Sequence, residues 1–220
     1  MEARSVLDVG AGDAWFAGRF RQRYPRDEVV CWDAAYSEER VQTLQAAALD
    51  LTFVASAPAG PFDLVLMLDV IEHVKDDAGF LRDVIGRLRP GGTAVVSVPA
   101  WSWLYGPHDV RLGHLRRYSP TGARRLLSAA GLKVEEAGGL FHSLLPARAA
   151  ALLGGRLSRL IGKGAQAGDA AADLGNWDGG ATITRILDRS LRLEGWFSRR
   201  VAALGVEWPG LSWWARCRKP

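Results

Sequence analysis

The stretch SVLDVGAGDAW, Ser5–Trp15, decides the fold of this chain. Its first five residues form a short apolar run, which is typical of a buried β-strand, and a turn with Gly10 and Gly12 follows. A helical pattern begins at Ala14. Between a strand and a helix, a glycine-rich turn lets the backbone approach a ligand closely and directs N–H groups toward it. We therefore predict a ligand site at the end of the first strand.

Outward from this stretch, short apolar runs alternate with helical segments. The predicted strands are Ser5–Val9, Val29–Trp32, Leu51–Ala55, Phe62–Leu68, Thr93–Val98, Leu132–Ala137 and Leu211–Arg218. The predicted helices are Ala14–Arg23, Ser37–Ala48, Asp77–Leu88 and Thr121–Ala130. Because strands that alternate with helices form parallel sheets, we expect an α/β fold with helices on both faces of the sheet.

The segment 140–208, between the last two predicted strands, is too long for a simple connection. We expect one domain over 1–220, in which 140–208 forms a helical insertion that serves as a lid over the acceptor. The middle of the insertion, Gly162–Gly180, is rich in glycine, alanine and aspartate and is predicted to be a loop.

A helix over 183–204 is predicted to be amphipathic. Its apolar face carries Ile183, Ile186, Leu187, Leu193, Phe197, Val201 and Leu204, and its basic face carries Arg185, Arg189, Arg192, Arg199 and Arg200. The basic face is either a solvated surface or a docking site for acidic lipid or protein.

The composition is that of a soluble globular protein, with 48% hydrophobic and 24% charged residues. No apolar run approaches the roughly 18 residues of a membrane span, and the run after Met1–Arg4 is too short for a signal peptide. We therefore expect a cytoplasmic protein without a transmembrane segment. Cys31 and Cys217 lie in predicted strands roughly 19 Å apart, so we expect free thiols and no metal site.

Charge is distributed unevenly along the chain. Residues 1–110 carry 10 Lys and Arg against 16 Asp and Glu, a net −6, whereas residues 111–220 carry 18 against 8, a net +10. This is either a chance division of surface charge or the sign of an anionic acceptor, an acidic partner or a membrane surface facing the second half. With no RNA- or DNA-binding motif in the chain, we expect no nucleic-acid partner.

An acid at the end of the second predicted strand points to the ligand. Asp33 can accept hydrogen bonds from a ribose diol, as acids at this position do in dinucleotide folds. A dinucleotide fingerprint, however, requires a small residue at position 15, where this chain has Trp15. The pattern favours an adenosyl ligand without phosphates, such as S-adenosylmethionine. The alternative is a structural turn with an unrelated aspartate downstream.

Three motifs together resemble those of class I S-adenosylmethionine-dependent methyltransferases. Asp8–Gly12 resembles the first motif of that family, with Ala14 where many members have a third glycine. Phe62–Val74 is similar to the fourth-strand signature, and Leu88–Thr93 to the turn before strand five. The resemblance implies a Rossmann-like seven-stranded sheet of order 3-2-1-4-5-7-6, with strand seven antiparallel.

The resemblance also implies S-adenosylmethionine as cofactor and S-adenosylhomocysteine as product. The residues it assigns to the cofactor are Asp8, Gly10, Ala11 and Gly12 at the amino-acid end, Asp33 at the ribose, Ala34 at the adenine, and Leu68 and Asp69 beside the sulfonium. The chain departs from the family after strand three, where Ser56 stands near the position of an acid that holds the adenine amino group.

The loop after the fifth strand is the predicted acceptor site, because ligands bind beyond the carboxyl ends of strands in such sheets. Aromatic residues at alternate positions, followed by polar ones, predict a pocket with an apolar wall and a polar end. The predicted acceptor-binding residues are Trp101, Trp103, Tyr105, Asp109, Arg117 and Tyr118. The stretch 109–118 resembles a type 11-like methyltransferase subgroup, found alone or fused to glycosyltransferases, with the pattern Asp-x(4)-His-x-Arg-Arg-Tyr.

Methyl transfer is an in-line displacement in which positioning alone can supply up to roughly 7–11 kcal/mol. A general base is needed only if the acceptor loses a proton. His114 and His73 are the candidate bases. Their alternative roles are a structural hydrogen bond from His114 to Asp109 or backbone, and a turn-shaping role for His73. Arg117 and Tyr118 either bind the acceptor or pack on the preceding loop.

We predict O-methylation of a small-molecule acceptor that is anionic or lipid-linked, with a peripheral membrane contact through helix 183–204. Two alternatives stay open. One is a non-catalytic S-adenosylmethionine-binding or partner module that retains the fold, and the other is an NAD-dependent oxidoreductase, against which Trp15 argues.

Overall fold

A computed structural model describes residues 4–48, 50–160 and 180–220 of the chain. Its strands are β1 (Ser5–Val9), β2 (Glu28–Trp32), β3 (Thr52–Val54), β4 (Phe62–Leu68), β5 (Leu88–Pro99), β6 (Lys133–Leu140) and β7 (Ser212–Arg218). The α-helices are α1 (Trp15–Arg23), α2 (Glu38–Ala47), α3 (Asp77–Gly86), α4 (Pro107–Arg111), α5 (Pro120–Ala129), α6 (Leu144–Leu160) and α7 (Gly180–Ala203). Two 3₁₀ turns, η1 (Ile71–His73) and η2 (Ser102–Leu104), complete the described elements.

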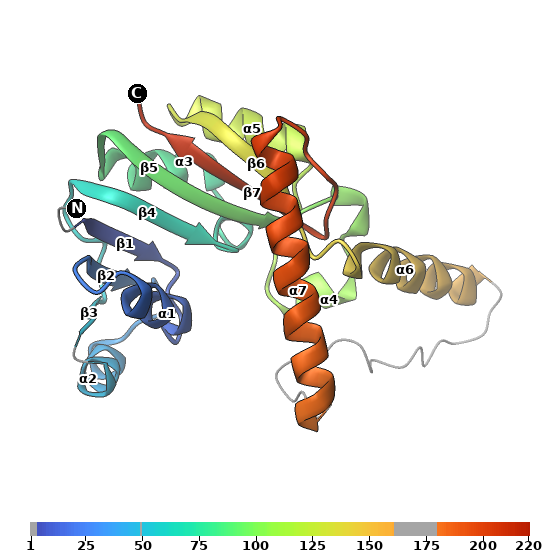
Figure 1. Ribbon diagram of the computed structural model, residues 1–220, viewed down its shortest axis with the longest axis horizontal. Helices are drawn as coiled ribbons and strands as arrows, with labels where there is room; N and C mark the ends of the chain where they lie inside the picture. The colour runs from blue at the N-terminus through green and yellow to red at the C-terminus, as the bar shows by residue number, and fades with distance from the viewer. Residues whose placement is uncertain (1–3, 49, 161–179) are drawn as a thin grey trace. The chain divides into compact units, whose positions relative to one another are not determined.

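The strands form one seven-stranded sheet in the order β3-β2-β1-β4-β5-β7-β6, whose strands are labelled in Figure 1. β1 pairs in parallel with β2 and with β4, and β4 pairs in parallel with β5. The start of β5 lies beside the end of β7, since Gly91 N donates to Lys219 O and Lys219 N donates to Gly92 O. β7 is therefore antiparallel, and the predicted order and direction are confirmed.

Most predicted bounds differ from the structure by one or two residues, β6 extends to Leu140 rather than Ala137, and two further elements differ more. β5 begins at Leu88 rather than Thr93, because Leu88 pairs with Phe62 and a register shift takes up the residues between Leu88 and Thr93. The Pro90–Gly92 turn is thus a bulge within the strand rather than the end of α3. The second element is α6, for which the predicted helical insertion gave no bounds, and the helix continues through Gly154 and Gly155. Each mid-helix glycine costs about 1 kcal/mol against alanine, which the surrounding leucine, alanine and arginine residues offset.

The described residues divide into two compact units. Unit 1 comprises 1–98, 121–136 and 214–220, and unit 2 comprises 99–120 and 137–213. The predicted insertion at 140–208 lies within unit 2, which also takes in 99–120. The predicted loop at 162–180 lies outside the described residues except for Gly180, where α7 begins.

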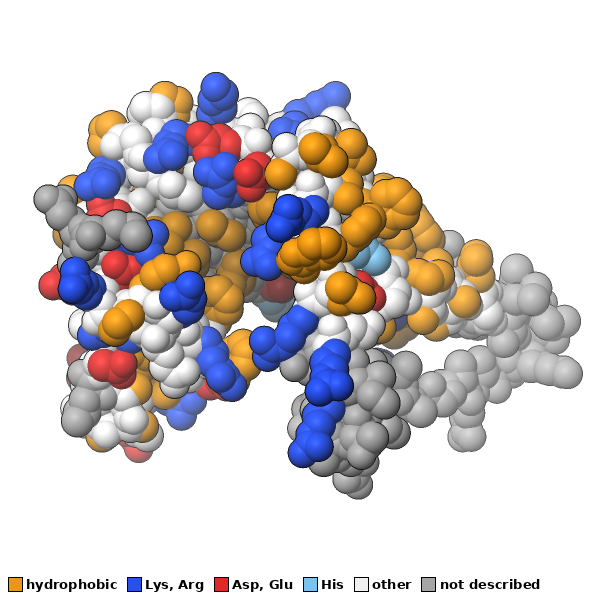
Figure 2. Space-filling view, viewed as in Figure 1, with side chains coloured by type: hydrophobic (Ala, Val, Ile, Leu, Met, Phe, Trp, Pro, Cys, Tyr) orange, Lys and Arg blue, Asp and Glu red, His pale blue; other side chains and the backbone are white. Residues whose placement is uncertain are grey.

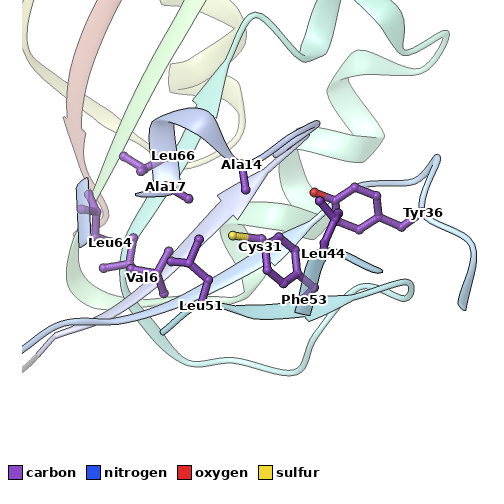
Figure 3. Packing of buried hydrophobic residues seen from close by; sticks show 11 residues of the cluster. Val6, Ala14, Ala17, Cys31, Tyr36, Leu44, Leu51, Phe53, Leu64 and Leu66 are labelled. Atoms are coloured by element: carbon purple, nitrogen blue, oxygen red, sulfur yellow. The ribbon is translucent and has the colours of Figure 1, made fainter. Parts of the chain in front are cut away.

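In unit 1, apolar side chains fill the space between the sheet and its helices. One cluster joins the sheet to α1 and α2, as Figure 3 shows for its labelled members. Its members include Val6, Val29, Cys31, Phe53, Leu64 and Leu66 of the sheet, Ala14 just before α1, Ala17 of α1 and Leu44 of α2. α3 buries Leu81, Val84 and Ile85. Strands buried in this way carry continuous apolar runs, which is why the sequence predicts them well.

In unit 2, the side chains of α7 that are buried among the described ones are small. Ser198 and Ala202 are buried, and the Ser198 hydroxyl donates to Gly139 O. An amphipathic helix ordinarily buries its apolar face, but Leu193 and Phe197 of the predicted apolar face are exposed. Among the described residues, no helix is both long and apolar enough to cross a membrane. Cys31 and Cys217 are free and buried.

Candidate functional site

The turn after β1 folds back onto the end of β2. Gly10 N and Ala11 N both donate to Trp32 O, at 2.7 and 3.2 Å. Gly10 has a φ of +69°, and a Cβ there would lie 2.7 Å from Val70 Cγ2. Gly12 has a φ of +56° with no atom near its missing Cβ. Position 10 thus requires glycine because φ is positive and because a side chain would clash with Val70. Position 12 favours glycine only because φ is positive.

The peptide group at Gly12 is clamped from both sides. Gly12 N donates to Asp33 Oδ2 at 3.0 Å, and the Tyr36 hydroxyl donates to Gly12 O at 2.7 Å. The other carboxylate oxygen of Asp33 accepts from Ala35 N at 2.8 Å. Asp33 therefore positions the glycine turn in addition to its predicted ribose contact. Sequence reasoning missed Tyr36, whose only signal is its place three residues after Asp33.

Asp8 is a buried carboxyl group beneath this turn. Its side chain is 4% exposed, and no hydrogen bond or ion pair to it is found among the described residues. Burial first, and then the nearby charge of Asp33, raise the pKa of Asp8 to about 7. A carboxylate so placed gains most from a ligand cation, because a nearby positive charge compensates the charge that burial penalises.

The position of Trp15 at the start of α1 tests the prediction that this residue excludes a dinucleotide. Trp15 is 64% exposed, and the Arg19 guanidinium lies 5.4 Å from its ring centroid. Ala14 and Ala17 are the small residues that pack against the sheet. The steric argument from Trp15 against a dinucleotide is therefore wrong, because Trp15 does not occupy the helix–strand contact. Ala14 instead takes the left-handed conformation, with a φ of 59°, at the position of the family's third glycine.

The remaining predicted cofactor residues lie at the same edge of the sheet, because β1, β2, β3 and β4 run in parallel. Ala34 and Ser56 are exposed after β2 and β3, and Leu68 is half-buried at the end of β4. Asp69 is exposed with a φ of 55°, and its N–H donates to the backbone and side-chain oxygens of Ser97 at 3.1 Å each. Such left-handed non-glycine backbone is concentrated at functional sites. His73, in the next turn, is exposed.

In unit 2, the loop after β5 is closed by backbone pairing. Trp101, with a φ of 65°, donates its backbone N–H to Tyr118 O and its Nε1–H to Gly210 O, each at 2.8 Å. The Tyr105 hydroxyl donates to His114 O at 2.9 Å. Trp101 and Tyr105 are half-buried, and Trp103 is 53% exposed. These three aromatic side chains are the accessible part of the predicted acceptor loop.

Asp109 is the centre of this loop. It is fully buried, and its Oδ1 accepts from Arg117 Nε at 2.6 Å and lies 3.2 Å from His114 Nδ1. Its Oδ2 accepts from Gly106 N and from Arg148 Nη2, both at 3.0 Å. Burial alone would raise the pKa of Asp109, but the Arg117 charge and these hydrogen bonds reverse the effect and lower it.

Asp109, Arg117 and Tyr118, which were predicted to contact the acceptor, are buried. Arg117 also donates from Nη1 to Ala100 O, and Tyr118 is 8% exposed. These contacts favour a role in holding the loop. Sequence reasoning missed Arg148 of α6, although a single arginine within the apolar stretch 144–153 is a signal for a buried ionic partner.

The comparisons with known proteins all point to one family. A family model described as a methyltransferase domain matches residues 2–137. A Mycolicibacterium smegmatis relative, named "Probable S-adenosylmethionine-dependent methyltransferase", is 30% identical over 149 residues, which cover 63% of this chain and 56% of the relative. A trans-aconitate 2-methyltransferase of Azoarcus sp. strain BH72 is 27% identical over 150 residues, covering 66% and 56%. The chain spans about half the length of the curated relatives it matches.

Solved structures agree on the fold. A Bacillus halodurans protein described as a methyltransferase superposes with a TM-score of 0.52 and 19% identity, covering 62% of this chain and 66% of that protein. At this identity the likeness concerns the fold alone. The family match covers the whole first half, in which the glycine turn, Asp8 and Asp33 lie.

Proposed function

The chain belongs to the methyltransferase domain family, and we propose that it transfers the methyl group of S-adenosylmethionine to an oxygen atom of a small-molecule acceptor. The observation that carries the proposal is Asp8, a buried carboxyl group with a pKa of about 7 and no described cation. The ammonium group of S-adenosylmethionine would supply that cation. The residues present thus fit the cofactor.

Each part of the cofactor has a residue to hold it in this proposal. Asp8 and the backbone of Gly10, Ala11 and Gly12 hold the amino-acid end, and Asp33 accepts from the ribose through lone pairs not used by Gly12 and Ala35. Ala34 and Ser56 border the adenine, and Leu68 and Asp69 border the sulfonium. When bound, the cofactor would supply an activated methyl group to the acceptor oxygen, with S-adenosylhomocysteine as the leaving group.

We assign the acceptor to the aromatic loop of unit 2. Trp101, Trp103 and Tyr105 form its wall, and the described parts of the insertion, 140–160 and 180–208, form its lid. His114 is the base if the acceptor is a hydroxyl group. Because the Asp109 carboxylate can only accept a hydrogen bond, its contact with His114 holds a proton on Nδ1 and fixes the orientation of the ring. His73 is the second candidate base.

The acceptor class rests on two observations. One relative is named for methylation of trans-aconitate, a small molecule. The second half of this chain carries a net charge of +10, which suits an anionic or lipid-linked acceptor. The proposal includes contact between α7 and a membrane that presents such an acceptor.

The first test is calorimetric titration with S-adenosylhomocysteine and with NAD. We expect saturable binding of S-adenosylhomocysteine only, weakened more than about tenfold in Asp33→Ala, which removes the acceptor of the ribose hydrogen bonds. Saturable NAD binding without a response to S-adenosylhomocysteine would establish the oxidoreductase alternative instead.

The second test is methyl transfer to a panel of phenols, catechols, sugars and prenylated quinones. We expect His114→Asn to lower turnover about 10²–10⁴-fold with cofactor affinity unchanged, and His73→Asn to have little effect. The reverse pattern would make His73 the base. Tight cofactor binding with no turnover on any acceptor would favour the non-catalytic module.

A further inference from the structure

The exposed side of α7 is apolar where a helix of this kind is normally buried. Leu193 is 66% exposed, Trp196 49% and Phe197 41%, whereas the helix packs through Ser198 and Ala202. Trp208, which follows the helix, is 50% exposed. We call Leu193, Trp196, Phe197 and Trp208, together with Arg192, Arg199 and Arg200, the α7 face.

The aromatic side chains of the α7 face are ordered against one another. The Phe197 ring meets the Trp208 ring edge-on at 5.9 Å, and the His142 ring meets Phe197 in the same way at 6.4 Å. His142 is fixed by a hydrogen bond from Nδ1 to Pro209 O at 2.7 Å. These rings, with Leu193, Glu194 and Trp196, line a cavity of about 390 Å³. An apolar cavity of this size suits a hydrocarbon chain.

Basic side chains border the apolar ones. Arg192, Arg199 and Arg200 are exposed, and the Arg200 guanidinium lies 5.2 Å from the centroid of the Trp196 ring. Figure 2 shows apolar and basic side chains gathered side by side along α7. The helix carries five arginines and two acids in its sequence, and Glu194, the acid that lines the cavity, accepts a hydrogen bond from Ser143 N.

The basic and apolar side chains of the α7 face together indicate which partner it binds. A second copy of the chain, related by a two-fold axis, would bring both copies' sets of these arginines into one interface, where contacts between like charges are unfavourable. An anionic bilayer matches both features, since tryptophan and phenylalanine insert at the headgroup level while arginines contact the phosphates.

We propose that the α7 face binds the surface of an anionic lipid bilayer, with one acyl chain entering the cavity beside His142. The inference rests on the membrane contact of the proposed function and deepens it, because it names the residues and the lipid charge. Vesicle binding needs neither the cofactor nor methyl transfer, so its failure would remove the membrane contact and leave the cofactor site and the methyl transfer to their own tests.

The test is co-sedimentation of the full chain with phosphatidylcholine vesicles, with and without one quarter phosphatidylglycerol. We expect binding to the anionic vesicles that weakens as salt is raised. Removing two cations in Arg199→Gln/Arg200→Gln should weaken it about fivefold for each arginine. Trp196→Gln/Trp208→Gln removes the inserting rings and should weaken it at least tenfold. Brominated acyl chains should quench the fluorescence of the parent protein and quench the double tryptophan variant less.

The matched control is Trp15→Gln/Arg19→Gln, which removes the same kind of exposed tryptophan–arginine pair from unit 1. It should leave vesicle binding unchanged. Folding of each variant is checked by circular dichroism, and S-adenosylhomocysteine titration reports separately on the cofactor site.

Three results would overturn the proposal. The first is no binding to anionic vesicles by the folded chain. The second is equal loss of binding in the control and in the α7 variants. The third is concentration-dependent self-association that Trp196→Gln/Trp208→Gln abolishes in the absence of lipid, which would assign the face to a second copy.

Discussion

Asp8 in unit 1 and Asp109 in unit 2 are both buried aspartates, and their surroundings are opposite. Asp8 has no described cation, and burial raises its pKa to about 7. Asp109 contacts two arginines and His114, which lower its pKa despite burial. The two aspartates show that burial alone does not set the pKa of a carboxyl group, because the charges around it decide the direction of the shift. Unit 1 buries a carboxyl group without a described cation, whereas in unit 2 the buried carboxylate of Asp109 is bonded to side chains and backbone of its own loop and of α6.

The two units also differ in how many large hydrophobic side chains they expose. Among the described residues, unit 1 exposes three large hydrophobic side chains, Trp15, Phe16 and Tyr24, whereas unit 2 exposes thirteen. A parallel sheet between helices buries its apolar residues within unit 1 itself. Unit 2 leaves apolar residues of α7 on its surface, where a contiguous apolar patch marks an interaction site.

The largest expected effect tests the role of Asp109. Asp109→Ala leaves Arg117 and Arg148 as buried cations without their carboxylate, so the free energy of unfolding should fall by about 3–5 kcal/mol. Urea unfolding at pH 8 measures it. At the same pH, Asp8→Asn should be neutral or stabilising, because it removes a buried charge with no described partner. A loss below about 1 kcal/mol in Asp109→Ala would contradict the assigned role.

The second prediction concerns the pH dependence of unit 1. The pKa of Asp8 is about 7 in the folded chain against an ordinary value of 3.8, so the folded state holds this proton more tightly than the unfolded state does. The stabilisation is complete below about pH 4 and is lost as the pH rises through 7, by up to about 4 kcal/mol. Unfolding midpoints between pH 5 and pH 8 in the absence of cofactor should therefore fall, and Asp8→Asn should flatten the profile. An identical slope in the variant would remove Asp8 as the cause.

The third prediction separates the two glycines of the turn. Gly10→Ala adds a clash with Val70 to left-handed strain and should cost about 2–3 kcal/mol of unfolding free energy. Gly12→Ala, with open space at the Cβ, should cost only about 1 kcal/mol. Thermal unfolding of both variants measures the difference. Adding Val70→Ala should recover part of the loss in Gly10→Ala and none in Gly12→Ala, and equal recovery in both would exclude the clash.

The smallest expected effect tests the clamp on Gly12. Tyr36→Phe removes one hydrogen bond to Gly12 O and should cost about 1 kcal/mol of unfolding free energy. Tyr24→Phe is the control in the same unit, since Tyr24 is 42% exposed. Chemical unfolding of the two variants side by side measures the difference, and an equal change in both would show that the Tyr36 hydroxyl does not stabilise the turn.

The parts of the fold that local pattern controls could be predicted. β1 and β4 begin and end where the sequence predicts, because both are mainly apolar runs, with one aspartate each, bounded by turn or polar residues. The order of the sheet followed from the family's motifs. The bulge in β5 could not be predicted from local signals, because Pro90–Gly92 has the composition of a helix stop and only pairing with β4 makes it part of a strand.

In the candidate site, too, some residues could be predicted from local sequence patterns and others could not. The positive φ of Gly10 and Gly12 and the place of Asp33 after β2 could be predicted, because glycine in a turn and the end of an apolar run are local features of the sequence. Tyr36 and Arg148 were missed because each acts on residues distant in the chain, Gly12 and Asp109, and sequence spacing does not encode such contacts.

The sequence by itself therefore determined the α/β fold, the strand that carries Asp8 and the turn that follows it, since these depend on short-range periodicity and on glycine's freedom at positive φ. Only the tertiary structure decided that Trp15 lies outside the helix–strand contact, that Asp109 is enclosed by two arginines, and that α7 is held by Ser198 and Ala202 with its aromatic residues exposed. Burial is a property of what packs against a residue, and a helical pattern shows an apolar side without showing what covers it.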